Sequence, residues 1–241
     1  KALEVGYRHI DTAYLYLNER GVGEALRRSG LDRDDIFVTT KVWNTDHGYD
    51  ETLRAFDKST GLLGIDEVDL YLIHWPTPAR DIYLDSWRAL IRLSEEGRAR
   101  SIGVSNFHEA HLRKIIDETG VIPAINQIEL HPWLPQTHMR DIDARLGIKT
   151  EAWSPLGSGR LIDDPVIAEV AAKHGKSPAQ VMVRWSLQLG NIVLPKSVTP
   201  ERIEQNIDVF DFVLDDADMA AIATLESGRR TGPNPDEFNE A

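Results

Sequence analysis

Short, mostly apolar runs alternate with longer amphipathic segments along the whole chain. The short runs are rich in β-branched and aromatic residues. They lie at residues 7–11, 36–41, 68–74, 101–105, 124–128, 149–153 and 192–195. Continuous apolar character over a few residues is typical of strands that are buried on both faces of a parallel sheet. The pattern therefore predicts seven buried parallel strands.

The segments between these runs carry helix signals. Leu84, Trp87, Leu90 and Ile91 recur at the spacing of one helix face, which predicts that Trp87 belongs to the core. Three helix starts combine a capping residue with proline at the first helical position: Asp164-Pro165, Ser177-Pro178 and Thr199-Pro200. Strands that alternate with helices in this way predict βαβ units.

The number of units distinguishes an open sheet from a closed barrel. Seven strand–helix units fit residues 1–227, whereas a closed barrel needs eight. Residues 1–6 have the pattern of the last turns of a helix that stops at Gly6. We therefore expect an α/β fold, a (β/α)8 TIM barrel, as a single domain over residues 1–241. Its first strand and part of its first helix would lie upstream, in about 30 further residues, and residues 228–241 would form a C-terminal loop.

Composition narrows the classes of partner. The 241 residues include 27 Lys and Arg, 39 Asp and Glu, and no Cys. A net charge of −12 argues against nucleic acid as the main partner. The lack of cysteine excludes a disulfide framework, a zinc–thiolate site and a cysteine nucleophile. No apolar run approaches the 18 residues of a membrane span. We expect a cytoplasmic monomer with a small-molecule substrate and no metal.

Polar or aromatic side chains stand at the C-terminal end of every predicted strand. In chain order they are Asp11 with Tyr16, Lys41 with Trp43, His74 with Trp75, Ser105-Asn106, Gln127, Trp153-Ser154 and Lys196-Ser197. In a barrel these strand ends meet on one face, and that face carries the active site. Taken singly, some have structural explanations: a helix cap, a solvated strand end, a core histidine or packing at the rim. Their shared placement favours function.

Four of these side chains together predict proton transfer to a carbonyl oxygen. A buried Lys41 needs an anion, which Asp11 on the neighbouring strand supplies. An ammonium beside a phenol lowers the pKa of Tyr16 and makes it a general acid. The His74 imidazole orients the carbonyl through a hydrogen bond. No side chain supplies a hydride, so a cofactor must bring it.

Five segments resemble signatures of the aldo-keto reductase family, in the family's order. They are residues 6–13 with Tyr16 and Asn18-Glu19, and residues 69–76, 103–107, 126–129 and 195–198. The resemblance spans essentially the whole chain. Within the family, the chain most resembles bacterial 2,5-diketo-D-gluconate reductases. The residues that suggest this subgroup are Trp43-Asn44, residues 74–78 and Pro235-Asp236-Glu237. Leu17 departs from the family, in which many members have glycine. The resemblance implies NADPH-dependent reduction of aldehydes or ketones, including small carbonyls and diketo sugars.

The resemblance also implies roles for individual residues. The catalytic set is Asp11, Tyr16, Lys41 and His74, with Tyr16 as the proton donor. Trp43 and Trp75 would wall the substrate pocket. Trp153 would stack on the nicotinamide, whose carboxamide would be held by Ser105, Asn106 and Gln127. The pyrophosphate would lie along Ser154, Leu156 and Ser158, and the 2′-phosphate of NADPH would be held by Lys196, Ser197, Val198, Arg202, Gln205 and Asn206.

Physical reasoning supports the phosphate site and leaves alternatives open. The helix predicted to start at Thr199-Pro200 has Lys196 and Arg202 near its N-terminus, and such a terminus attracts phosphate. The two cations are otherwise ordinary surface charges. Two other functions remain: a cofactor-binding sensor or accessory protein on the same fold with little turnover, and a Schiff-base aldolase that uses Lys41 or Lys196.

Overall fold

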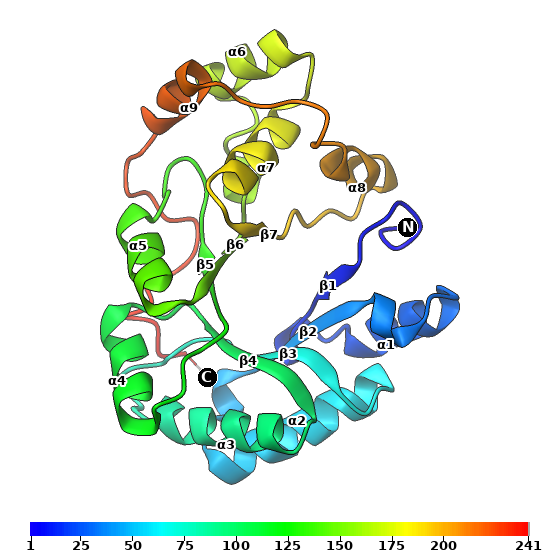
Figure 1. Ribbon diagram of the computed structural model, residues 1–241, viewed down its shortest axis with the longest axis vertical. Coiled ribbons are helices and arrows are strands. Elements are labelled where there is room, and N and C mark those ends of the chain that lie inside the picture. The colour runs from blue at the N-terminus through cyan, green and yellow to red at the C-terminus, as the bar shows by residue number, and fades with distance from the viewer. Residues whose placement is uncertain (241) are drawn as a thin grey trace. The chain divides into compact units, whose positions relative to one another are not determined.

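The structure, a computed structural model, describes residues 1–240 (Figure 1). These residues divide into two compact units. Unit A comprises Arg8–Asn126, Arg145–Ile148 and the tail from Pro233 onward. Unit B comprises Lys1–Tyr7, Gln127–Ala144 and Lys149–Gly232. The assignment of a single barrel domain to residues 1–241 stays a prediction, and Ala241 lies outside the described residues.

Seven strands in the described chain follow one another in the sheet in chain order. They are β1 (His9–Asp11), β2 (Phe37–Val42), β3 (Val68–Ile73), β4 (Ala99–Ser105), β5 (Ile125–Glu129), β6 (Lys149–Trp153) and β7 (Ile192–Val193). Strands β1 to β4 pair in parallel, as do β6 and β7. Each strand overlaps one of the predicted apolar runs, which confirms the strand positions. Strands β2 to β6 are mostly buried as predicted, whereas β1 and β7 are only half-buried.

The helices are α1 (Glu19–Arg28), α2 (Tyr49–Leu63), α3 (Tyr83–Glu95), α4 (Glu109–Thr119), α5 (Thr137–Leu146), α6 (Pro165–His174), α7 (Pro178–Gln188), α8 (Pro200–Ile207) and α9 (Asp216–Ala223). Helices α1 to α5 each follow one strand, as predicted, whereas α6 and α7 both lie between β6 and β7, and α8 and α9 both follow β7. Short 3-10 helices occur at η1 (Tyr14–Tyr16), η2 (Arg33–Asp35), η3 (Asn44–Asp46) and η4 (Gly157–Gly159). None of the helices within residues 1–240 is long and apolar enough to cross a membrane.

The three predicted helix starts are confirmed, since α6, α7 and α8 all begin at the expected proline. Asp164 caps α6 by accepting a hydrogen bond from the amide of Val166 at 2.9 Å. Ser177 caps α7 through a reciprocal capping box with Gln180. Thr199 precedes α8 but makes no side-chain capping bond.

Residues 1–6 form turns whose last hydrogen bonds are those of a helix C-terminus. The amide of Tyr7 donates to the carbonyl of Ala2 at 3.1 Å, and the amide of Gly6 donates to the carbonyl of Leu3 at 3.3 Å. This pair of bonds is the Schellman pattern of a helix C-terminus. Gly6 has φ +107°, a backbone conformation that favours glycine. These turns therefore stop at Gly6 in the predicted way, although residues 1–6 themselves form no regular helix.

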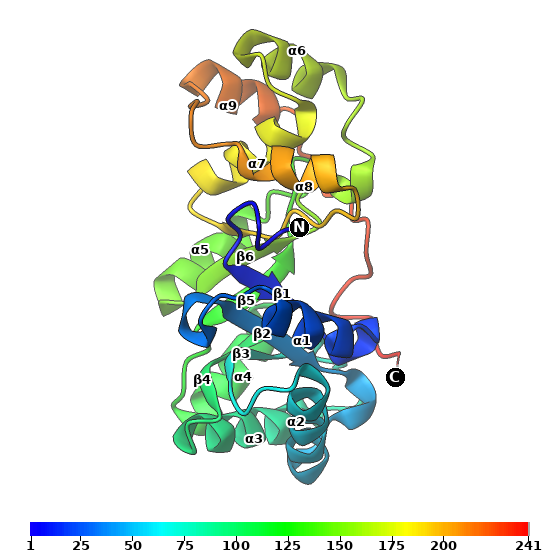
Figure 2. The same cartoon turned by 90° about the vertical axis from the view of Figure 1, so that its right-hand side faces the viewer.

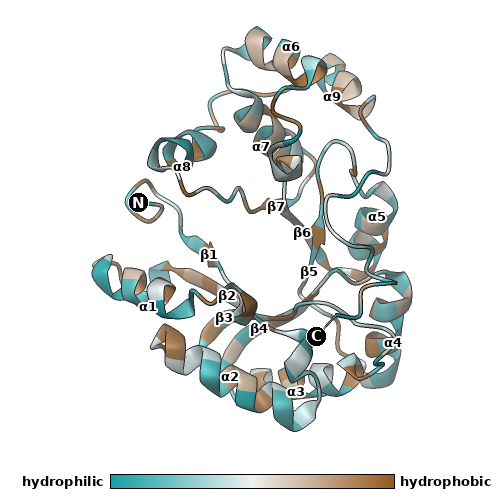
Figure 3. Ribbon diagram, turned by 180° about the vertical axis from the view of Figure 1, so that it is seen from behind, coloured by the Kyte–Doolittle hydropathy of each residue, from teal (hydrophilic) through white to brown (hydrophobic). Residues whose placement is uncertain are grey.

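The core of unit A lies between β1–β4 and the helices that cover them, α1, α2 and α3 (Figure 1). In Figure 3, brown marks hydrophobic residues on β2 and β3, whereas α2 and α3 alternate between brown and teal, as amphipathic helices do. Strand β3 is buried along its whole length. Trp87 of α3 is fully buried, and its indole N–H donates to Thr119 at 3.2 Å, so its predicted place in the core is confirmed.

In unit B, helix α6 packs against α7 and α9, and α7 packs against α8 (Figure 2). Lys173 and His174 at the end of α6 contact Asp218 of α9 at 2.8 and 2.7 Å, which links these two helices by charge. Residues 228–240 form neither helix nor strand, as predicted for the C-terminal loop.

Helices α1 and α2 touch backbone to backbone at one glycine. A Cβ atom on Gly23 of α1 would lie 2.0 Å from the carbonyl oxygen of Leu63 in α2, far inside van der Waals contact. Gly21 lies in the same helix, and a Cβ there would meet nothing within 4 Å. Only Gly23 is therefore required by the packing.

We expect Gly23→Ala to lower the free energy of unfolding by about 1–3 kcal/mol, the usual cost of forcing an extra carbon into a packed interface. The matched change Gly21→Ala should raise it by about 0.5–1 kcal/mol, because alanine loses less backbone entropy in a helix. Chemical denaturation of both variants measures the two values. Similar effects at the two positions would contradict the packing of α1 on α2.

Candidate active site

Lys41 of β2 and Asp11 of β1 form a buried ion pair. The Lys41 side chain is fully buried, and its Nζ donates to Asp11 Oδ1 at 2.6 Å and to the carbonyl oxygen of Thr12 at 2.9 Å. The parallel register pairs Asp11 with Thr39, so the Lys41 side chain starts two residues further along the neighbouring strand. The alternative of a solvated strand end for Lys41 is excluded by this burial.

Tyr16 ends η1 beside this ion pair. The Nζ of Lys41 lies 5.3 Å from the centroid of the Tyr16 ring. Desolvation raises the pKa of Tyr16 above its ordinary value, and the Lys41 ammonium lowers it by less. The expected net lowering of this pKa is therefore wrong for the free chain, although Lys41 acts in the expected direction. Tyr16 is protonated at neutral pH.

Leu17, which follows Tyr16, adopts a backbone conformation that favours glycine. Its φ is +54°, and its side chain is 87% exposed. Its amide donates to the carbonyl of Tyr14 at 3.2 Å, which closes the η1 turn. The leucine therefore accepts local strain of about 1 kcal/mol and leaves the turn that carries Tyr16 intact.

His74 follows β3 and faces two aromatic rings edge-on. Ring centroids are 5.7 Å apart for Tyr16 and His74 and 5.1 Å apart for Trp43 and His74. The ring is buried, and desolvation, reinforced by the Lys41 charge, holds the pKa of His74 well below its usual range. A neutral imidazole has one N–H to donate. Asn106 fixes the strand end by donating to the carbonyl of His74 at 3.0 Å and to Ser105 Oγ at 3.0 Å.

The C-terminal tail lies against the predicted substrate residues, a contact that sequence reasoning missed. The Phe238 and Trp75 ring centroids are 4.6 Å apart. The side-chain oxygen of Asn239 accepts from the amide of Ala79 at 2.7 Å, and Asn44 Nδ2 donates to the carbonyl of Glu240 at 2.7 Å. The tail has no periodic pattern, so no sequence signal predicted this docking.

The predicted cofactor residues of unit B form two groups. In the first, Gln127 donates to the buried Glu151 at 2.7 Å, and the Oγ atoms of Ser154 and Ser158 are 3.0 Å apart. Both serines have positive φ, +53° and +55°, so residues 154–158 make a tight loop at the end of β6. Trp153 directly precedes this loop, and Leu156 occupies the N-cap position of η4 without a side-chain hydrogen bond.

The second group surrounds the start of α8. Lys196 and Arg202 are exposed, and neither forms an ion pair with another described residue. Ser197 Oγ accepts from the amide of Thr199 at 3.2 Å, and the first amides of α8 receive no cap from Thr199. Val198 and Gln205 are exposed, and Asn206 is buried. An uncapped helix N-terminus beside two unpaired cations fits a phosphate group.

The structure thus brings together the four predicted catalytic side chains and, separately, the two groups of predicted cofactor residues. Thr12, whose carbonyl accepts from Lys41, was missed by sequence reasoning. Glu129 and Thr231 were also missed, although Glu129 lies in one of the signature segments. The individual roles of all these residues stay predictions.

Comparison with known proteins gives consistent matches. The sequence model of the Aldo/keto reductase family matches residues 1–227. A Mycolicibacterium smegmatis protein named aldo-keto reductase is 59% identical over 238 residues, which are 99% of this chain and 86% of the relative. Methylglyoxal reductase DkgA of Escherichia coli is 51% identical over 240 residues, again 99% of this chain and 86% of the relative.

A solved structure provides the corresponding comparison of folds. The crystal structure of a variant of Gox0644 in complex with NADPH is 50% identical to this chain, with a TM-score of 0.94. The match covers 98% of this chain and 86% of that chain. The predicted barrel-type α/β fold class is thereby confirmed.

The buried His47 beside His74 predicts a pH dependence of stability. Desolvation, with the Arg80 charge, lowers the pKa of His47 to about 3. As the pH falls, His47 is therefore protonated first in the unfolded chain, at a pH near 6.5. Stability is complete above that pH and falls as the pH drops toward 3, by up to about 1.4 kcal/mol per pH unit for this residue. His47→Gln should reduce the slope of unfolding free energy between pH 6 and pH 4 by that amount, as measured by denaturation at a series of pH values. Equal slopes for wild type and His47→Gln would contradict the burial of a neutral His47.

Proposed function

The chain belongs to the aldo/keto reductase family, and on that premise we propose that it reduces small aldehydes and ketones to alcohols with NADPH. As a member of this family it is an NAD(P)H-dependent oxidoreductase that acts on carbonyl groups. Because the E. coli relative is named for methylglyoxal, a small dicarbonyl compound, we infer that small dicarbonyl compounds, with diketo sugars among the candidates, are substrates of this chain.

The observation that carries this proposal is the buried ion pair beside Tyr16. NADPH, when bound, supplies the hydride. The hydroxyl of Tyr16 donates a proton to the carbonyl oxygen as negative charge develops there. Its raised pKa keeps it protonated and ready to donate. A developing alkoxide is a much stronger base than a phenolate, so the transfer is favourable, and the Lys41 ammonium stabilises the phenolate that remains.

His74 orients the substrate in this proposal. Because its pKa is well below the usual range, it remains a neutral hydrogen-bond donor at working pH. Its position between the Tyr16 and Trp43 rings supports a carbonyl placed against all three side chains. Trp75 then borders the pocket, with Phe238 of the tail packed against it.

The cofactor residues are assigned by the family resemblance and supported by their chemistry. We assign Trp153 to the nicotinamide ring, the loop at residues 154–158 to the pyrophosphate, and residues 196–206 to the 2′-phosphate. Ser105, Asn106 and Gln127 are assigned to the carboxamide. The unpaired Lys196 and Arg202 support NADPH over NADH, because only NADPH has a 2′-phosphate for them to bind.

The Schiff-base alternative has little support. A nucleophilic lysine must be neutral and accessible, whereas Lys41 is fully buried and already donates to Asp11 and Thr12. Lys196 is exposed on the segment before α8 and lacks the enclosed apolar pocket of a Schiff-base lysine. A sensor with little turnover would not need the proton donor, which the next experiment tests.

We expect Tyr16→Phe to lower the rate of NADPH-dependent methylglyoxal reduction by about 10²–10⁴-fold, the usual contribution of a general acid. The affinity for NADPH should stay unchanged, because only a hydroxyl is lost. Tyr14→Phe is the matched control, since Tyr14 lies in the same 3-10 helix and its hydroxyl bonds Lys58 on the surface. Steady-state kinetics and NADPH binding measure both effects. Reduction by Tyr16→Phe within about threefold of wild type would reject Tyr16 as the proton donor.

Arg202→Ala should weaken NADPH binding by about 1.5–3 kcal/mol, the value of a hydrogen bond to a charged group. NADH binding should be nearly unaffected, because NADH lacks the 2′-phosphate. Dissociation constants for both nucleotides provide the comparison. If the two nucleotides lose affinity equally, Arg202 has a structural role or contacts the part that they share.

A further inference from the structure

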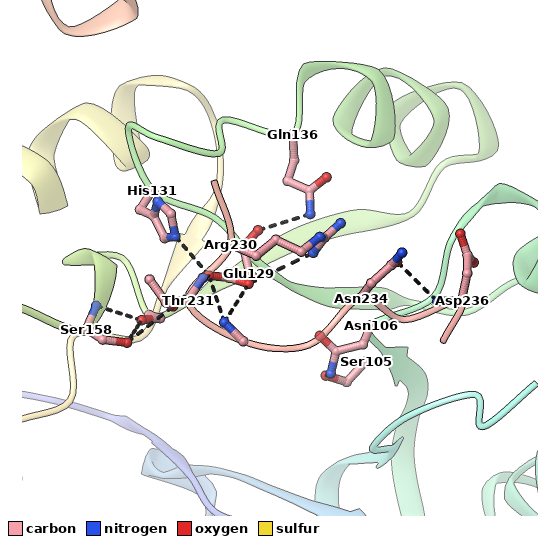
Figure 4. A network of polar contacts seen from close by, with 12 residues as sticks. Ser105, Asn106, Glu129, His131, Gln136, Ser158, Arg230, Thr231, Asn234 and Asp236 are labelled. Carbon is pink, nitrogen blue, oxygen red and sulfur yellow. Dashed lines mark hydrogen bonds and ion pairs between the residues drawn. The ribbon is translucent and has the colours of Figure 1, made fainter. Parts of the chain in front are cut away.

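Glu129, at the end of β5, is a fully buried carboxylate that binds a segment about 100 residues away. Its Oε1 accepts hydrogen bonds from the amide and the hydroxyl of Thr231, the latter at 2.6 Å, and from His131 Nε2 at 2.9 Å. Its Oε2 accepts from the amide of Gly232 at 3.2 Å. Figure 4 shows these contacts converging on the carboxylate. We call residues 230–232 the C-terminal strap.

The charge of Glu129 is compensated where it lies. Burial raises the pKa of Glu129, but the hydrogen bonds from His131 and Thr231 lower it by more, so its pKa is below the ordinary value. Arg230 Nη1 lies 3.9 Å from Oε2 and adds a positive charge. The carboxylate is therefore ionised at neutral pH and can only accept hydrogen bonds. Every group that points at it must act as a donor.

This requirement sets the direction of a chain of hydroxyl groups. Thr231 Oγ1 donates to Glu129, so it accepts from Ser158 Oγ at 3.2 Å. The Ser158 proton is thereby used, so in the 3.0 Å contact between the two serines Ser154 is the donor. The amide of Ser158 in turn donates to Ser154 Oγ at 3.0 Å. The charge of Glu129 thus orients the hydroxyl groups of the loop at residues 154–158 through Thr231, although Glu129 does not contact this loop.

The strap also lies directly against Trp153. A Cβ atom on Gly232 would be 2.6 Å from Cη2 of the Trp153 ring and 3.5 Å from Glu129 Oε2. No side chain fits there, so the backbone of the strap rests against the edge of the indole. The guanidinium of Arg229, just before the strap, lies 4.4 Å from the Trp133 ring centroid and anchors the residue that leads into the strap.

We propose that Glu129 is a positioning residue for the cofactor. Glu129 holds the C-terminal strap against Trp153 and Ser158, and the strap in turn fixes the ring that stacks on the nicotinamide and the loop that binds the pyrophosphate. This inference rests on the proposed function, because that function assigns Trp153 and Ser158 to NADPH. Glu129 itself is fully buried, and its side chain contacts His131 and the C-terminal strap. Its effect should therefore fall on NADPH affinity and on the order of the strap, and leave the chemical step unchanged.

Two variants of Thr231 test the inference with little risk to folding. Thr231→Val keeps the shape and both backbone donors but removes the hydroxyl that links Glu129 to Ser158, whereas Thr231→Ser keeps the hydroxyl. Glu129→Gln removes the charge. We expect Thr231→Val and Glu129→Gln to weaken NADPH binding about tenfold, the scale of one lost hydrogen bond to a charged group. Turnover at saturating NADPH should stay within about twofold, and Thr231→Ser should match wild type.

Trypsin provides a readout without the cofactor, because Arg229 directly precedes the strap and Arg230 is its first residue. Cleavage there releases the C-terminal residues, which mass spectrometry detects. We expect Thr231→Val and Glu129→Gln to be cleaved about tenfold faster than wild type and Thr231→Ser, since a released strap exposes these sites. NADPH should slow the cleavage of the wild-type protein.

The outcomes separate the inference from the proposed function. If cleavage accelerates while the dissociation constant for NADPH stays unchanged, the strap is only a structural anchor and the inference is rejected. If neither changes in Thr231→Val, the hydroxyl chain has no role and the inference is also rejected. If the wild-type protein itself fails to bind NADPH, the proposed function fails first and the inference falls with it. Should Glu129→Gln fail to fold, Thr231→Val alone decides.

Discussion

The ion pair between Lys41 and Asp11 is the interaction on which the rest of the candidate site depends. A fully buried ammonium is stable only if an anion and further acceptors surround it. Asp11 and the carbonyl of Thr12 supply them from the neighbouring strand, because parallel pairing brings the ends of β1 and β2 to the same edge. The positive charge then stabilises a phenolate at Tyr16 and opposes protonation of His74. This charge therefore acts on both neighbours, alongside the desolvation that makes the larger contribution to the pKa of each.

Buried carboxylates connect distant segments in the same way elsewhere in the chain. Asp69 of β3 accepts from the amide of Val38 at 2.8 Å and pairs with Arg33 and Arg100 at 2.7 and 3.1 Å, which ties β2, β3 and β4 together. Glu129 collects donors from the C-terminal strap in unit B. In each case the cost of burying the charge is offset by several hydrogen bonds, so the segments that supply them are held in one arrangement.

C-terminal segments contact predicted site residues within unit A and within unit B. In unit A the tail packs Phe238 on Trp75 and bonds the loop after β3 through Asn239. In unit B the strap rests on Trp153. The tail has no regular structure of its own, so its position depends on the groups that receive it. Family membership identifies the reaction as carbonyl reduction.

The sequence alone determined the strands, the helix starts and the four catalytic candidates, because apolar periodicity, proline at a first helical turn and short signature segments are local properties. Only the tertiary structure decided the pKa of Tyr16, for which desolvation outweighs the nearby Lys41 charge. It alone also joined Glu129 to Thr231 and Phe238 to Trp75, contacts between residues more than 100 positions apart. Such contacts have no local pattern, since they depend on how the folded backbone brings remote donors to one buried acceptor or one ring to another.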